Sequence, residues 1–191
     1  MNLDELHGET ALQVPAAPRM YVDQALQLSA KEFFRESKAW RVMTDPLVFG
    51  DDDEYEISAP FNTEIVEPIK ILVDGIPMRS DQWTAVEEGE FGGIVVHFFD
   101  RPYKMQFMAE LAVTLATGSR EIPNRLGREF RDGIIHGALA RMLRVPNTDW
   151  TDLNLSGFHQ GMFLEAIDRA ATRVENGMKL RRTRVVRYGG L

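Results

Sequence analysis

The chain has 191 residues, 44 % of them hydrophobic, which suits one globular domain or one core that carries an insertion. It has no cysteine, which excludes disulfides and thiolate zinc sites, and no apolar run of the roughly 18 residues that a membrane span needs. The net charge of −7 argues against a generic nucleic-acid-binding protein, which would be basic.

The first 20 residues show no sustained hydrophobic period and contain Pro15 and Pro18. We therefore predict an extended N-terminal arm. The segment is acidic and lacks a basic stretch ahead of an apolar one, so we expect no secretory signal. Together with the lack of cysteine, this indicates a protein made and folded in a reducing cytoplasm.

A helix is predicted over 21–38, because apolar side chains recur there at helical spacing: Val22, Leu26, Ala30 and Phe33. Phe34 stands outside this stripe, which indicates a second contact for the helix.

From Trp40 to about Leu115 the hydrophobic pattern changes to a period of two and to short apolar runs, as in antiparallel strands. Asp74-Gly75, within ILVDGIPM, predicts a tight hairpin because both residues accept the positive φ values of a type I′ turn. The acidic run GDDDE at 50–54 is expected to be a solvated loop. We predict an antiparallel β module of five to seven strands.

Helical spacing returns after residue 119, and Pro123 suits a first helical position. The second helix carries three glycines, each of which weakens a helix by about 1 kcal/mol relative to alanine. Close approach by another backbone would explain why they are there. A third helix is predicted over 152–176. The side chains expected to pack the helices together are Phe33, Phe130, Gly133, Ile134, Gly137, Phe158 and Met162.

A single helix of about 18 residues is marginal in water, so the first helix should fold onto the two later ones. The predicted fold class is α+β: a small bundle of three main helices with an antiparallel β module inserted between the first and second, plus extended N- and C-terminal arms. The predicted divisions are the N-terminal arm 1–20, a discontinuous helical bundle 21–39 and 119–177, the β module 40–118 and a basic C-terminal arm 178–191.

No pattern in the sequence carries recognisable chemistry. The four histidines, His7, His97, His136 and His159, lack a second ligand at metal-binding spacing, and the serines lack a G-x-S-x-G elbow. No glycine-rich phosphate loop is present. We therefore expect no catalytic residue, no metal, no cofactor and no enzymatic activity, and we interpret His136 as a bystander beside Gly137.

The last 14 residues are the most informative feature. Residues 178–191 carry five basic side chains and no acidic one, so residues 1–177 carry a net charge of −12. The segment is either a frayed terminus, an arm that docks on a protein partner through arginines and apolar anchors, or a DNA-binding element. The candidate docking residues are Lys179, Arg181, Arg182, Arg184, Val185, Val186, Arg187 and Tyr188.

Four successive parts of the chain together are similar to the head-to-tail adaptor proteins of tailed bacteriophages, also called head-tail connector or tail tubular A-type proteins. These parts are EFFRESKAW at 32–40, the β insertion with VDG at 73–75, EIPNRLGREFRDGIIHGALARMLRVPNTDW at 121–150, and a third helix leading into an arginine-rich tail. The resemblance covers most of residues 21–191 and is strongest over 121–177. It rests on helix patterning and architecture.

The resemblance implies a virion structural protein at the head-tail interface. It would form a homo-oligomeric ring, usually of twelve subunits, that joins the portal protein to a tail tube or nozzle protein. DNA would pass through the channel without sequence-specific binding, and no membrane would be involved. The portal-binding element would be Lys179 to Leu191. Phe34 and Ile135, which stand off the main stripes, would suit subunits that bury a second face. The alternatives are a nucleic-acid-binding regulatory module that uses the basic tail and, third, a small hydrolase with a dispersed site.

Overall fold

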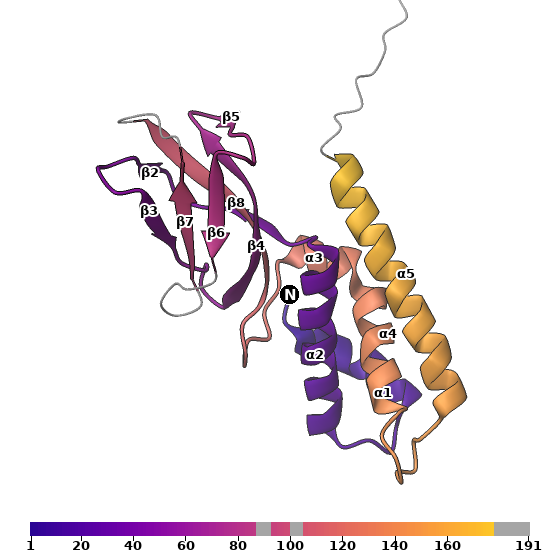
Figure 1. The fold of residues 1–191 in the computed structure, drawn as a ribbon. Coiled ribbons are helices and arrows are strands. Elements are labelled where there is room, and N and C mark those ends of the chain that lie inside the picture. Colours follow the sequence, from indigo (N-terminus) through magenta and orange to yellow (C-terminus); the bar gives the residue numbers. More distant parts are fainter. Residues whose placement is uncertain (87–92, 100–104, 178–191) are drawn as a thin grey trace, which may run out of the picture.

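The computed structural model describes residues 1–86, 93–99 and 105–177, and Figure 1 shows the helices on one side of the molecule and the strands on the other. The helical elements are the 3-10 helix η1 (Leu3–Leu6), α1 (His7–Gln13), α2 (Arg19–Ser37), α3 (Asn124–Glu129), α4 (Arg131–Met142) and α5 (Leu153–Gly177). The strands are β1 (Arg41–Met43), β2 (Leu47–Val48), β3 (Glu54–Ile57), β4 (Thr63–Val73), β5 (Ile76–Pro77), β6 (Trp83–Val86), β7 (Ile94–Phe98) and β8 (Gln106–Leu115).

Helix α2 lies at the centre of the fold, where it packs against α1, α4, α5 and β8. Its predicted apolar stripe is fully buried: Val22, Leu26, Ala30 and Phe33. Phe34 is buried as well, and its ring lies edge-on to that of Trp40 with 5.5 Å between centroids. The second contact of this helix is therefore made within the chain, and Phe34 does not present a surface to a neighbouring subunit.

The prediction of an extended arm over residues 1–20 is wrong. Leu3 and Leu6 are buried, and η1 and α1 pack against α2. Helix η1 starts at a capping box. The Asn2 side chain accepts a hydrogen bond from the backbone N–H of Asp4, and the Glu5 carboxylate accepts one from the N–H of Asn2. Two short helices carry too few apolar residues to produce a periodic signal, so the sequence pattern missed them.

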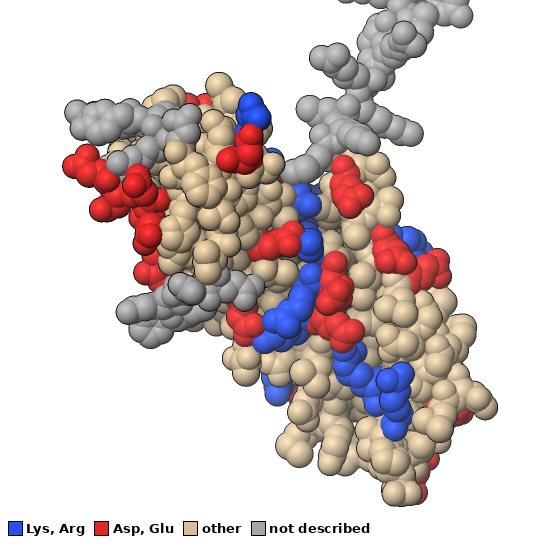
Figure 2. All heavy atoms as spheres, viewed as in Figure 1, with Lys and Arg blue, Asp and Glu red and all other residues tan. Residues whose placement is uncertain are grey.

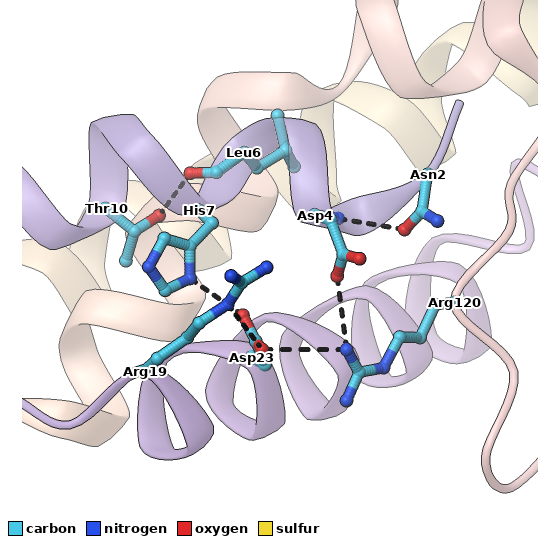
Figure 3. Close-up of polar contacts among 8 residues, drawn as sticks. All are labelled: Asn2, Asp4, Leu6, His7, Thr10, Arg19, Asp23 and Arg120. Atoms are coloured by element: carbon cyan, nitrogen blue, oxygen red, sulfur yellow. Dashed lines mark hydrogen bonds and ion pairs between the residues drawn. The ribbon is translucent and has the colours of Figure 1, made fainter.

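One carboxylate holds this N-terminal segment on α2 (Figure 3). The nearly buried Asp23 lies 2.7 Å from Nδ1 of His7 and 3.6 Å from both Nε of Arg19 and Nη1 of Arg120. Arg120 also reaches Asp4 at 3.2 Å. Residues from η1, α1, α2 and the loop before α3 thus meet at a single charged cluster.

The strands form two antiparallel sheets. The first has the order β1-β8-β4-β5, with β2 also paired to β8, and the second has the order β3-β7-β6. Register shifts on β4, between Ile65 and Glu67 and between Pro68 and Lys70, curl the first sheet. The hairpin predicted at Asp74-Gly75 is confirmed: it joins β4 to β5, with φ values of 47° and 83°.

An aromatic cluster joins the two sheets. Phe107 on β8 lies 5.1 Å from Phe98 on β7, and Phe49, which follows β2, lies within 5 Å of both rings. Tyr55 on β3 completes the cluster, and its hydroxyl oxygen accepts a hydrogen bond from the Gly50 N–H at 2.6 Å. The short strands are therefore held by packing between their faces as well as by backbone pairing.

The predicted fold class is wrong in its architecture. The described residues contain five α-helices and two antiparallel sheets, one of them curled, in place of three helices with one inserted β module. The helix expected after Pro123 is two helices, because the chain bends at Phe130 (φ −109°) between α3 and α4.

The sheets and helices also share one buried core, because α2 packs directly on β8. The ion pairs Lys31–Glu64 and Lys38–Glu67 cross the same boundary. The predicted boundaries between the helical bundle and the β module, after residues 39 and 118, stay a prediction.

Candidate functional site

Glycines on α4 allow α2, α4 and α5 to approach closely. A Cβ at Gly137 would lie 2.2 Å from Oγ of Ser29 on α2 and 2.6 Å from the Phe163 ring on α5. At Gly133 a Cβ would lie 2.9 Å from that of Ala166 and 3.0 Å from the Phe33 ring. Both positions therefore lie where the helices leave no room for a side chain.

The other predicted packing residues on the first two helices are in the core or beside it. Ile134 and Phe33 are fully buried. Phe130 is half-buried and lies 5.1 Å from the Phe33 ring.

The predicted packing face of α5 is wrong by one position. Phe158 is 57 % exposed and Met162 is only half-buried. The buried face consists of Ser156, His159, Phe163, Ile167 and Ala170. Phe158 therefore faces outward, while Ser156 and His159 turn inward and satisfy their polar groups there. The Ser156 hydroxyl, for example, donates to the carbonyl oxygen of Ala140 at 2.7 Å.

The structure brings together two histidines that lie 23 residues apart in the sequence. Nδ1 of His136 on α4 lies 2.7 Å from Nδ1 of His159 on α5. Such a contact needs one donor and one acceptor, so the two neutral rings must be in different tautomers. Burial lowers the pKa of both histidines, and the charge of His136 lowers that of His159 further.

This pair lies at one side of a groove of about 340 Å³ between α1, α4 and α5, which we call the helical groove. Its lining residues are Glu9, Leu12, Gln13, Asp132, Ile135, His136, Leu139 and His159. Leu12 is 80 % exposed at the rim, and the exposed Phe158 lies edge-on to His136 at 6.4 Å. The groove combines three apolar residues, Leu12, Ile135 and Leu139, with five polar or charged ones, so it suits a segment of another protein that presents an apolar side chain flanked by polar groups.

The histidine pair predicts a pH-dependent stability. Because both folded-state pKa values lie below the ordinary value of 6.5, protonation favours the unfolded chain, and the stability present above that value is lost as the pH falls through it. The carboxylates facing the pair, Glu9 and Asp132, would reduce this loss.

We expect the free energy of unfolding in urea to fall between about pH 7.5 and 5. We expect the double variant His136→Gln/His159→Gln to lose less over this range. Equal pH slopes for the two proteins would contradict this assignment, and the comparison cancels the contributions of the other histidines.

A second groove, of about 510 Å³, lies where the helices meet the sheets, and we call it the junction groove. Its lining residues are Ala39, Trp40, Arg41, Val42, Pro123, Arg125, Leu126, Glu129, Phe130, Arg173 and Val174. Figure 2 shows Lys and Arg side chains interspersed with Asp and Glu along the boundary between the helices and the sheets. The groove combines an apolar floor with three arginines and one carboxylate, so its net charge is positive.

Sequence reasoning missed both grooves, since each is assembled from segments that are distant in the chain. The predicted portal-binding residues, from Lys179 to Tyr188, lie outside the described residues. In the part of the chain that the structure describes, no three histidine, aspartate or glutamate side chains are grouped so as to hold a metal ion, and no helix is long and apolar enough to cross a bilayer.

The sequence matches no model of a known protein family, and no curated protein matches it.

Proposed function

We propose that this protein is a non-enzymatic structural subunit of a tailed-bacteriophage virion. As a head-to-tail adaptor, it forms a homo-oligomeric ring at the head-tail interface. The ring joins the portal protein to a tail tube or nozzle protein, and DNA passes through its channel. The proposal combines the sequence resemblance with the surface features of the fold.

The observation that carries the proposal is the presence of two unlike docking grooves on one subunit. The helical groove has an apolar floor, with Leu12 and Phe158 exposed beside it. The junction groove is rich in arginine and is lined by residues of β1, of α3 and of the last turns of α5. A subunit that contacts two neighbours and two different partners needs several dissimilar surfaces, because head-to-tail contacts in a ring join different patches.

The charge distribution supports the same function. Residues 1–177 carry a net charge of −12, which would repel the phosphates of DNA and keep it from adhering to the channel. The five basic residues of 178–191 suit a docking segment that pairs with carboxylates of the portal.

A co-sedimentation experiment tests the proposal. Purified protein mixed with portal rings of the same virus should sediment with them, and at physiological salt it should show little affinity for duplex DNA in a fluorescence anisotropy titration. If the protein does not co-sediment with the portal and binds DNA with a steep salt dependence, the nucleic-acid-binding alternative is correct and the adaptor proposal is wrong.

A further inference from the structure

The junction groove has the chemistry of a docking site for an acidic segment with an apolar side chain. Arg125 is exposed and has no ion-pair partner among the residues that the structure describes, whereas Arg173 pairs with Glu129 and Arg41 lies 3.8 Å from Glu110. Trp40, Leu126 and other apolar side chains form the floor. A carboxylate ligand would pair with the guanidinium groups while an apolar side chain covers this floor.

The same chain carries a surface with the opposite character. We call it the acidic edge, and its acidic members are all exposed: Asp51, Asp52, Asp53, Glu54 and Glu56. Figure 2 shows these acids gathered along the outer side of the sheets. Asp51, Asp52 and Asp53 also take part in interactions within their own subunit, and Glu54 lies 3.2 Å from Nδ1 of His97. Glu54 and Glu56 lie two residues apart on β3 and so point from the same face of the strand.

Large apolar side chains accompany the acidic edge. Phe99 is 70 % exposed, and it lies beside the acids because the Phe98 N–H donates to the carbonyl oxygen of Asp53 at 3.0 Å. Val48, at the end of β2, is 56 % exposed. The edge therefore offers both the charge and the apolar surface that the junction groove would bind.

The two surfaces cannot meet within one subunit. Figure 1 shows β3 at the outer edge of the sheets, whereas α3 and the end of α5 lie on the far side of β4 and β8. Complementary patches at separate places on one chain define a heterologous contact, which closes into a ring when the rotation between copies permits.

We propose that the junction groove binds the acidic edge of a second copy of this chain. Arg125 and its neighbours then pair with Glu54, Glu56 and the aspartates of the adjacent subunit, and Phe99 covers the apolar floor. This inference rests on the proposed ring and names the contact that builds it.

Charge reversal tests the contact. Sedimentation velocity would be measured at low salt for wild type, for Arg125→Glu, for Glu54→Lys/Glu56→Lys, and for the variant that combines all three substitutions. Each reversal should weaken self-association by about tenfold or more, because it places like charges together, and the combined variant should recover most of the affinity.

The matched control is the swap Arg79→Glu/Asp81→Arg, which reverses an exposed ion pair whose two residues belong to neither surface. It should leave self-association unchanged, and melting curves would verify that every variant folds. Failure of the combined variant to recover, or a wild type that stays monomeric at about 100 µM, would overturn the inference. A protein that shows either result and still binds the portal leaves the adaptor function standing, so the two proposals fail separately.

Discussion

Gly137→Leu should prevent the protein from folding. The Cβ alone would lie 2.2 Å from Oγ of Ser29 and 2.6 Å from the Phe163 ring, both of which are fully buried. Ser29 cannot turn away cheaply, because its hydroxyl donates to the carbonyl oxygen of Ile134 at 2.6 Å. Overpacking of a core costs about 1–3 kcal/mol when the neighbours can shift, and here the three helices that would have to separate form the centre of the fold. Soluble yield and thermal melting would measure the effect.

A smaller substitution at the same position, alanine, should destabilise the protein without preventing folding. Gly137→Ala should lower the free energy of unfolding by about 1–3 kcal/mol, even though alanine favours a helix by up to about 1 kcal/mol. The matched control is Gly161→Ala on α5, where a Cβ meets no atom within 4 Å. That variant should be neutral or slightly stabilised. A Gly137→Ala protein as stable as Gly161→Ala would contradict the described packing of α2, α4 and α5.

Deletion of residues 178–191 should abolish portal binding while leaving the fold intact. The segment contributes five positive charges and the apolar residues Val185, Val186 and Tyr188, whereas the residues that form the described core all precede it. We expect binding to the portal to weaken by about a hundredfold or more, since charge pairs and aromatic anchors carry most of the energy of such interfaces. The far-ultraviolet circular dichroism and the melting temperature should match those of the full chain.

A variant of unchanged length separates the contribution of the basic residues to portal binding from that of the apolar residues. Replacing the five basic residues of 178–191 with glutamine keeps Val185, Val186 and Tyr188, and it should lose the salt-dependent part of portal binding. Unimpaired portal binding by the deleted chain would remove the segment from the interface. If the deletion instead removes an affinity for DNA, the nucleic-acid-binding alternative is favoured.

The sequence predicts best the elements whose signals are local. The spacing of Val22, Leu26, Ala30 and Phe33 indicates α2, because one helix face supplies most of its burial. Asp74-Gly75 predicts its hairpin because few other residue pairs accept two positive φ values. In both cases a short stretch of chain contains the whole physical cause.

The errors arise where distant segments decide the structure. On α5 Phe158 faces outward and the polar Ser156 and His159 face inward, because partners on α4 satisfy their polar groups. The N-terminal helices are too short for a periodic signal and are fixed by Asp23 and Arg120. The pairing of His136 with His159 depends on the relative register of α4 and α5, which hydrophobic periodicity does not specify.

The same reasoning applies to the candidate sites. The junction groove combines residues near positions 40, 125 and 173, and none of these three segments carries a binding motif by itself. The basic residues of 178–191 were visible in the sequence because charge composition needs no fold to be recognised.

We propose that this chain forms a ring on a portal. Native mass spectrometry of the wild-type protein bound to its portal would test this ring, because the mass gives the number of copies. We expect a single complex with a fixed number of subunits closed into a ring, twelve if the resemblance to head-to-tail adaptors holds. A portal that carries no copies, or a variable number bound independently, would contradict it.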